Sequence, residues 1–517
     1  MAASQQHQPS AGRPATLTEW LGLAVLALPT FLLAVDMTVL HLAVPQLSAD
    51  LRPTSTELLW ILDIYGFMIA GFLITMGTLG DRIGRRRLLL TGAVAFGMAS
   101  ALAAFSTSAQ MLIATRALLG IAGATLMPST LSLIRNMFEV PAQRTIAITV
   151  WMNGFLVGSA LGPLIGGAML EYFWWGSVFL LGIPVMVLLV ISGPLLLPEF
   201  RDERAGSLDW GSALLSILMV LAVIYGVKDT ARNGVSLVAL ASILAGLAIG
   251  WAFIARQRAL LEPMFDLKLF LNRAFSTSVL ALMLTILALS GAWFLVFQYL
   301  QGVLGLSPLN AGLLMVPATL VQVSGSLVVP WLSRTIRPGI LVSGGLLIAT
   351  VGFLLMTQVD GPGTTGFLIA GTIVMGLGVM PMTILGTDLV ISSVPPAKAG
   401  AASATSETAA ELGMALGIAV IGSIGTAVYR RHMLAAMPDG LDAAQADTAA
   451  DTLGGALGVA QQVSATQGGQ LLEATREAFT LALHTNAVIG AVIVTATALF
   501  TARYLRHVPV SSSGGGH

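Results

Sequence analysis

Residues 77–87 read GTLGDRIGRRR, a short charged stretch between two long apolar segments, residues 58–79 and 88–106. A helix needs about 20 mostly apolar residues to cross a hydrocarbon core of about 30 Å. Both flanking segments have roughly that length, so we predict that the charged stretch is a tight loop between two membrane-spanning helices. Gly80 and Gly84 permit such a turn and a close approach of the two helices.

The whole chain has the composition of a membrane protein. Its 517 residues are 56% hydrophobic and 10% charged, with a mean hydropathy of +0.87. A soluble protein usually carries about 25% charged residues. The formal net charge is zero and there is no cysteine. These numbers exclude a basic nucleic-acid-binding protein, a disulfide framework, a thiolate metal site and a thiol nucleophile.

Fourteen apolar segments are long enough to span a bilayer, which predicts an all-α integral membrane protein. The longest uncharged run, residues 274–333, holds two of them, because the sequence SPLN at residues 307–310 is typical of a turn. The segments are residues 21–44, 58–79, 88–106, 111–133, 145–170, 175–197, 209–227, 236–255, 275–299, 310–333, 339–357, 365–387, 400–428 and 485–502.

Lysine and arginine orient this threading, since loops on the cytoplasmic side carry an excess of both. With the N-terminus inside, cytoplasmic segments hold 18 of the 25 basic residues and outer segments hold six, among them Lys228. Arg116 lies within a span. We therefore expect both termini in the cytoplasm. Residues 1–18 lack the pattern of a cleaved signal, and SSSGGGH at residues 511–517 is expected to be a flexible added tail.

The spans predict two halves. Residues 1–200 form one six-helix bundle, residues 201–258 two inserted helices that resemble spacers, and residues 259–510 a second six-helix bundle. Many transporters consist of two such halves with a substrate site between them near the middle of the membrane. Residues 431–480 are expected outside, as a loop with short amphipathic pieces. Two interpretations of that loop stay open: a surface excursion without a role, or a cover over the outer mouth.

The charged loop resembles the signature that joins the second and third spans in the major facilitator superfamily. The resemblance implies a gate that latches the two halves together in one conformation. Its residues would be Gly77, Asp81, Arg82, Gly84, Arg85 and Arg86. The alternative is a loop that serves only as a topology anchor.

Three further segments resemble motifs of the fourteen-helix drug:proton antiporters in that superfamily. Residues 32–45, LLAVDMTVLHLAVP, are similar to the first-span signature, and residues 112–124, LIATRALLGIAGA, to the fourth-span motif with its basic residue. Residues 151–167, WMNGFLVGSALGPLIGG, resemble the fifth-span antiporter motif. The resemblance implies close helix packing and a kink at Gly158, Gly162 and Pro163. Exporters of quaternary ammonium compounds and dyes look most similar, because acids recur in spans 1, 2 and 13.

Two features depart from that group. His41 stands where relatives often have asparagine, and the tenth span lacks an aspartate that some of these exporters carry. His41 is expected to be either a proton relay or a hydrogen-bonded interior residue. Asp388, near the cytoplasmic end of span 12, is expected to be a helix-end charge.

Charges inside the membrane usually mark a transport pathway. Asp36 lies deep in span 1, where it suits proton coupling; the alternative is a permanent salt bridge with Arg116. Asp63 is expected near the outer end of span 2, either as a substrate contact or as a solvated helix end. Glu407 and Glu411 share one face of span 13, since residues four apart stack along a helix. We expect them to bind protons or cargo, unless serine and threonine hydroxyls satisfy them.

Aromatic rings would contribute to a site for cationic cargo, because a cation over an aromatic face gains roughly 0.5 to 2 kcal/mol. Trp60, which is close to Asp63, and the pair Trp293 and Phe297 are the stronger candidates. Trp151, Phe294 and Tyr299 are further candidates.

Other classes of protein lack their signatures here. The three lysines, Lys228, Lys268 and Lys398, are followed by Asp, Leu and Ala, so there is no Walker A loop, and no histidines form an HExxH pair. An intramembrane enzyme and a sensor on a transporter fold remain as alternatives. We predict a proton-coupled efflux antiporter for lipophilic cations, without cofactor, metal or nucleic acid, acting as a monomer in the bacterial cytoplasmic membrane. The main alternative cargo is anionic, zwitterionic or metal-chelated.

Overall fold

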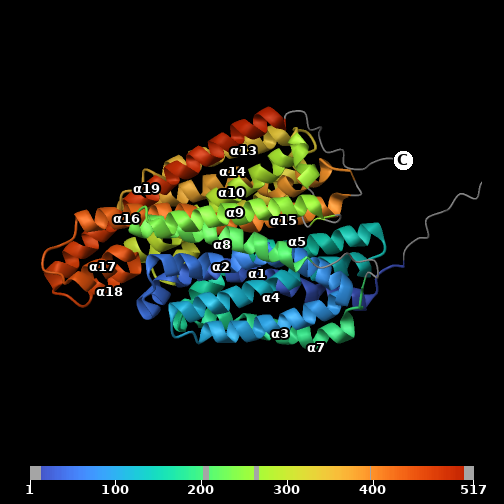
Figure 1. Cartoon of the computed structure of the whole chain (residues 1–517), viewed down its shortest axis with the longest axis horizontal. Coiled ribbons are helices and arrows are strands. Elements are labelled where there is room, and N and C mark those ends of the chain that lie inside the picture. Colours follow the sequence, from blue (N-terminus) through green and yellow to red (C-terminus); the bar gives the residue numbers. More distant parts are fainter. Residues whose placement is uncertain (1–12, 202–208, 261–262, 264–266, 396–397, 506–517) are drawn as a thin grey trace, which may run out of the picture.

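The computed structural model describes residues 13–201, 209–260, 263, 267–395 and 398–505. Within these residues the chain forms helices, turns and short loops and no strand. Most helices run along one common direction (Figure 1). Thirteen of the described helices are long and apolar enough to cross a membrane, and a bent pair within α5 gives a fourteenth span. Residues 511–517, which are expected to be an added tail, lie outside the described residues.

The first half occupies one side of the bundle in Figure 1, drawn in blue and cyan, with α7 in green. Its helices are α1 (Leu17–Leu51), α2 (Ser55–Ile83), α3 (Arg85–Ala104), α4 (Ala109–Met137), α5 (Pro141–Tyr172), α6 (Ser177–Leu180) and α7 (Gly182–Leu196). Two inserted helices follow, α8 (Trp210–Asn233) and α9 (Leu237–Ala259).

The second half, drawn in yellow to red, contains two stretches of π-helix, η2 and η5, that continue α10 and α15. Its elements are η1 (Leu267–Leu271), α10 (Arg273–Gln298), η2 (Tyr299–Val303), α11 (Pro308–Leu314), α12 (Val316–Leu332), α13 (Pro338–Met356), η3 (Pro362–Thr364), α14 (Thr365–Ser392), α15 (Ala399–Leu416), η5 (Gly417–Ile421), α16 (Gly422–Ala435), α17 (Ala443–Asp451), α18 (Leu453–Ala460) and α19 (Ala465–Tyr504).

Helix α5 is bent by 41° between Ser159 and Leu161. Pro163 follows directly, and a proline inside a helix has no N–H to donate to the residue four positions earlier, which here is Ser159. The same segment packs closely on both neighbours. A Cβ at Gly162 would lie 1.9 Å from Oγ1 of Thr38 on α1, and one at Gly312 on α11 would lie 2.4 Å from the Pro163 carbonyl oxygen. The expected kink and close packing are therefore present, and α5 meets α11 of the opposite half here.

The expected outer loop, residues 431–480, is largely helical. Helices α17 and α18 cap one end of the bundle (Figure 1), and α19 begins at Ala465, about five turns before the predicted last span. Its first turn is capped by Ser464, whose hydroxyl accepts a hydrogen bond from Gln467 N. Because Leu471, Ala478 and other residues of one face are buried, this part of α19 is held by packing as well as by the cap.

This end is where the halves are closed against each other. Gln301 Nε2 on η2 donates a hydrogen bond of 3.0 Å to the Leu42 carbonyl oxygen on α1. A Cβ at Gly454 on α18 would lie 2.5 Å from Ser48 Cβ on α1. These contacts support the interpretation of residues 431–480 as a cover. We call α17 and α18 the outer cover, after the side of the membrane that the sequence predicts for them.

Candidate functional site

The first candidate group is an ion pair between α1 and α4. Asp36 Oδ2 lies 2.7 Å from Arg116 Nη1, with side-chain exposures of 11% and 2%. The guanidinium also donates to the Ile61 carbonyl oxygen at 3.3 Å and lies 4.4 Å from the centroid of the Tyr65 ring. The salt bridge considered from the sequence is thus formed in this conformation. A pair of this kind holds two opposite charges together inside the first half.

Tyr65 on α2 is a residue that sequence reasoning missed. It is 1% exposed, and its hydroxyl has no hydrogen-bond partner among the described residues. It lies within electrostatic range of Asp36 and Arg116 in its own half and of Glu411 in the other half. A tyrosine in an apolar run looks like ordinary packing, so the sequence carried no signal for this position.

The two acids of span 13 lie on α15, as expected. Glu411 is 8% exposed, and its Oε2 has no hydrogen-bond partner within the described part of the chain. The neighbouring Thr408 hydroxyl donates instead to the Ala404 carbonyl oxygen at 2.9 Å. The idea that hydroxyls satisfy both carboxylates is therefore wrong for this oxygen. Glu407 is partly exposed and lies within electrostatic range of Arg135 on α4.

Asp63 on α2 is neither a solvated helix end nor close to the start of its helix. Its carboxylate lies 2.7 Å from Lys228 Nζ on α8, and both side chains are 0% exposed. Lys228 Nζ also lies 3.8 Å from the centroid of the Trp60 ring. The assignment of Lys228 to an outer loop is wrong, because α8 continues to Asn233 and turns this lysine into the bundle.

Aromatic side chains of the two halves contact each other. His41 on α1 stacks on Phe297 of α10 with ring centroids 6.5 Å apart, and Phe297 stacks on Trp293 at 5.5 Å. His41 Nδ1 has no hydrogen-bond partner among the described residues. The predicted pair of aromatics thus lies where the halves meet.

The remaining aromatic candidates lie elsewhere in the structure. Trp151 donates a hydrogen bond of 3.1 Å from Nε1 to Thr130 Oγ1 and is 7% exposed. Phe294 lines a small pocket with Leu59 and Tyr429 at the outer end. Tyr299 is fully buried and lies near Thr480, within the second half. Asp388, in contrast, is exposed near the end of α14, as expected.

The charged loop turns at Gly84, whose φ of 112° is one that other residues rarely adopt. Asp81 Oδ1 accepts a hydrogen bond of 2.8 Å from Arg85 Nε, and Arg85 Nη1 reaches the Pro128 carbonyl oxygen at 3.4 Å. Arg86 Nη1 donates to the Leu197 carbonyl oxygen at 2.9 Å. The Asp81–Arg85 bond lies within the loop, and the other two contacts run to α4 and to the end of α7. In this conformation they tie the loop to its own half, whereas Arg82 is exposed.

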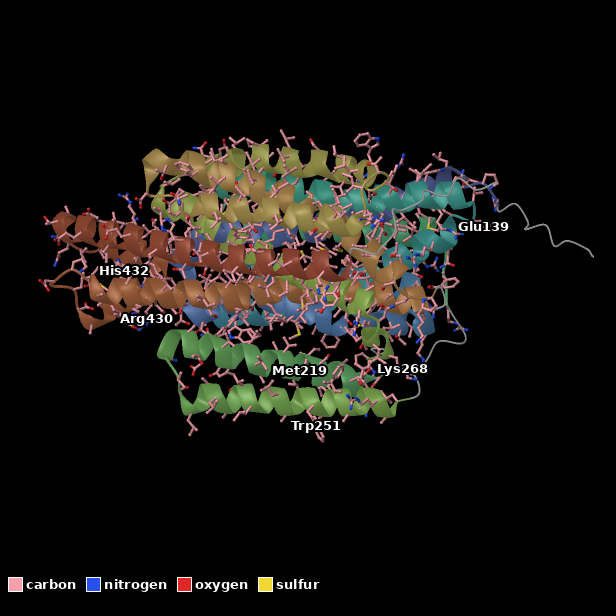
Figure 2. All side chains as sticks on the ribbon, turned by 90° about the horizontal axis from the view of Figure 1, so that it is seen from above. Glu139, Met219, Trp251, Lys268, Arg430 and His432 are labelled. Atoms are coloured by element: carbon pink, nitrogen blue, oxygen red, sulfur yellow. The ribbon has the colours of Figure 1, made fainter. Side chains whose placement is uncertain are left out.

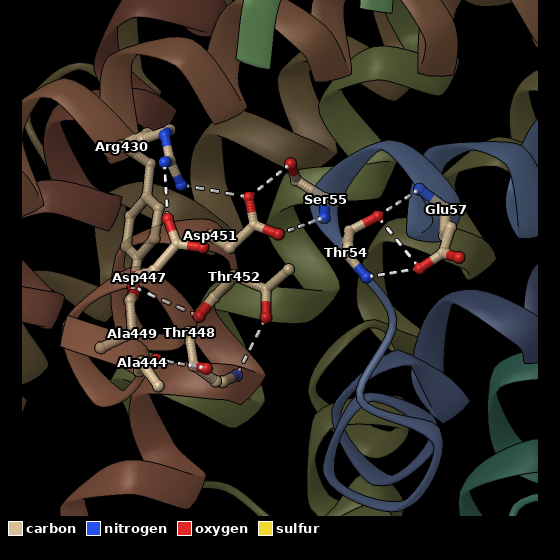
Figure 3. A network of polar contacts seen from close by, with 12 residues as sticks. Thr54, Ser55, Glu57, Arg430, Ala444, Asp447, Thr448, Ala449, Asp451 and Thr452 are labelled. Atoms are coloured by element: carbon tan, nitrogen blue, oxygen red, sulfur yellow. Dashed lines mark hydrogen bonds and ion pairs between the residues drawn. The ribbon is translucent and has the colours of Figure 1, made fainter. Parts of the chain in front are cut away.

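A polar network joins the outer cover to the first half (Figure 3). Asp451 at the end of α17 accepts hydrogen bonds from Ser55 N at 3.1 Å and from Ser55 Oγ at 3.0 Å. Arg430 on α16 lies 3.3 Å from the same carboxylate and 2.7 Å from Asp447. Because Ser55 is the first residue of α2, the network links the cover directly to the helix that carries Asp63 and Tyr65.

These groups are charged or aromatic side chains, most of them buried. They comprise buried carboxylates on both halves, two internal cations and aromatic rings. Groups of three or more side chains suited to a metal ion are absent from the part of the chain that the structure describes.

Comparison with known proteins identifies the family of this chain. The family model of the Major Facilitator Superfamily matches residues 26–418. The multidrug efflux pump LfrA of Mycolicibacterium smegmatis is 44% identical over 498 residues, covering 96% of this chain and 98% of its own. The methyl viologen resistance protein SmvA of Salmonella typhimurium is 35% identical over 462 residues, covering 89% and 93%.

Solved structures agree on the fold. The inward-facing, unoccupied structure of a bacterial homolog of the human lysosomal transporter Spinster has a TM-score of 0.65 at 17% identity, covering 96% of this chain and 100% of that one. A peptide transporter POT in complex with sulfate has a TM-score of 0.61 at 17% identity, covering 96% and 97%. The resemblance to drug antiporters with fourteen spans is confirmed, and the chain is a multi-pass membrane transporter, not an enzyme. Together, the matched family model and the two helical halves show that the chain belongs to the Major Facilitator Superfamily, among its drug efflux pumps.

Proposed function

We propose that this transporter exports lipophilic organic cations in exchange for protons across the bacterial cytoplasmic membrane, with both termini in the cytoplasm. The observation that carries the proposal is Glu411. Its carboxylate is buried, one of its oxygens has no hydrogen-bond partner among the described residues, and it lies within electrostatic range of Tyr65 on the half that holds Asp36 and Arg116. A carboxylate in such a place is stabilised by either a proton or a cation. Competition between the two for the same acids would couple their fluxes.

Asp36 and Arg116 suit the proton side of this exchange. While Asp36 is ionised, the pair is closed at 2.7 Å and the Arg116 charge is neutralised. Protonation of Asp36 would release the guanidinium within the first half. Glu407 and Glu411 would hold the cargo from the second half, and the aromatic pair Trp293 and Phe297 lies on the same half.

The two halves would rock about this site in an alternating-access cycle. In the conformation described here, the outer cover closes the outer end of the transporter. The loop of residues 77–87 would form its cytoplasmic latch in the opposite conformation, and Gly158, Gly162 and Pro163 would allow α5 to slide against α1 and α11. One chain holds both halves of the site, which favours a monomer as the working unit.

A relative's name supports a cationic cargo. SmvA is named for resistance to methyl viologen, and methyl viologen carries two positive charges. Carboxylates four residues apart on one helix face, as at Glu407 and Glu411, suit such a molecule.

Transport in proteoliposomes tests the proposal. An imposed proton gradient should drive uptake of cations into inside-out vesicles, and addition of cation should release protons in return. A panel of cations, anions and neutral compounds of similar size defines the cargo. Gradient-driven transport of anions but not cations would replace this proposal with the anionic or metal-chelated alternative.

A further inference from the structure

Lys228 is a cation that the chain itself places in a carboxylate and aromatic site. Its ammonium lies 2.7 Å from Asp63 and 3.8 Å from the centroid of the Trp60 ring, and neither charged side chain is exposed. A negative group combined with an aromatic face is the combination that binds organic cations. The two residues that the sequence suggests for cargo are thus already occupied by a lysine.

The site of Lys228, Asp63 and Trp60 lies where helix α8 packs against both halves. Trp60 packs in apolar clusters with Ile217 and Leu221 of α8 and with Leu412 and Leu416 of α15. Helix α8 therefore contacts both halves, and Figure 2 shows α8 and α9 side by side along one side of the bundle.

A lysine stem near the end of a span normally directs its ammonium toward water. Lys228 is five residues from the end of α8, yet it is fully buried. The attraction of Asp63 and the Trp60 ring accounts for this inward direction. A spacer helix that only connected two halves would need no such charge.

We propose that Lys228 is a tethered cation that occupies the site of Asp63 and Trp60 and so limits the positive charge that the transporter accepts in its cargo. The inference rests on the proposed function, since it takes the cargo to be cationic. With Lys228 in place, Asp63 is neutralised, and the acids of α15 are the negative groups that meet the cargo. Without it, Asp63 adds one negative charge.

The signs of the expected effects follow from this arrangement. Lys228→Gln frees the Asp63 carboxylate, which favours a dication over a monocation. Asp63→Asn leaves an uncompensated ammonium, which disfavours a dication more than a monocation. A pair that only fastens α8 to α2 predicts something different, because both changes would then weaken transport of both cargoes alike.

The experiment compares two probes in proteoliposomes at a fixed proton gradient: methyl viologen as the dication and tetraphenylphosphonium as the monocation. The measured quantity is the ratio of their transport efficiencies. Lys228→Gln should raise this ratio by about tenfold, or about 1.4 kcal/mol, and Asp63→Asn should lower it by a similar factor. The double variant, which has no uncompensated charge, should return close to the wild-type ratio.

Arg256→Gln provides the matched control. Arg256 lies 2.8 Å from Asp209 and joins the two inserted helices at the other end of α8. Its removal also breaks an ion pair of α8 but should leave the ratio unchanged. If only one of the single variants folds, its ratio alone distinguishes a tethered cation from a pair that only fastens α8 to α2. An unchanged ratio, or a shift of the same sign in both, overturns the tethered-cation proposal. If the wild type transports neither probe, the proposed function fails instead.

Discussion

Replacing Asp36 with asparagine separates the stability of the buried pair from its proposed role in coupling. Two unit charges 2.7 Å apart attract each other by about 6 kcal/mol at an effective dielectric constant of about 20. Desolvation offsets much of this, and removing one member of a buried pair destabilises proteins by about 3 to 5 kcal/mol. Asparagine still offers an oxygen to Arg116, and the guanidinium keeps the Ile61 carbonyl oxygen and the Tyr65 ring as neighbours.

We therefore expect Asp36→Asn to lose about 3 kcal/mol of unfolding free energy and yet to fold, because stabilities of 5 to 15 kcal/mol are typical. The folded variant should exchange labelled for unlabelled cation across proteoliposomes, since the acids of α15 are intact. It should fail to concentrate the cation against its gradient when only a proton gradient is supplied.

Two variants control this measurement. Asp36→Asn combined with Arg116→Gln removes both charges and should regain stability without regaining uphill transport. Asp388→Asn makes the same chemical change at an exposed carboxylate of α14 and should leave both properties unchanged. Full gradient-driven uptake by Asp36→Asn would refute the assignment of coupling to this carboxylate. Unchanged stability would refute the reasoning about the pair.

Three further changes address the loop, the cargo acids and the cover. Asp81→Asn removes the acceptor of Arg85 and should slow turnover while substrate affinity stays within a few fold; a hundredfold loss of affinity, about 2.7 kcal/mol, at unchanged turnover would contradict a gating role. Glu411→Gln should impair transport of a dication more than of a monocation, because a monocation can be neutralised by one acid; equal losses would make Glu411 a coupling or structural residue. Asp451→Asn should loosen the outer cover, and the chain has no cysteine, so a single cysteine at Leu58 reports this opening as faster labelling by an impermeant thiol reagent. An unchanged labelling rate would show that the network with Ser55 does not hold the cover closed.

The number of spans and their order could be predicted from the sequence because hydrophobic length is a local property. The ends of the spans could not be predicted in the same way. The last span predicted from the sequence begins at residue 485, whereas α19 begins at Ala465. Its first five turns are too polar to resemble a membrane span and are held by a Ser464 cap and by packing on α18. A hydropathy window does not detect a helix that continues out of the membrane.

Individual members of the candidate site were also predictable, but not all of their partners. Asp36, Glu407 and Glu411 stand out because charges are rare within apolar runs. The seventh span predicted from the sequence ends at residue 227, one residue before Lys228, which places the lysine in a loop. Its inward direction depends on Asp63, which is distant in sequence, and only the packing of α8 on α2 brings the two together.

Helix α2 connects these separate features. It is continuous from Ser55, which binds the outer cover, past Asp63 and Tyr65 to Asp81 in the charged loop. At 1.5 Å per residue, Ser55 and Asp81 lie about 39 Å apart. A continuous hydrogen-bonded helix resists shortening, so a shift of one end along the axis moves the other end with it. In the proposed cycle, opening of the outer cover would therefore act on the charged loop through α2 itself, and on α8 through the Lys228 ion pair, without any separate chain of side-chain contacts.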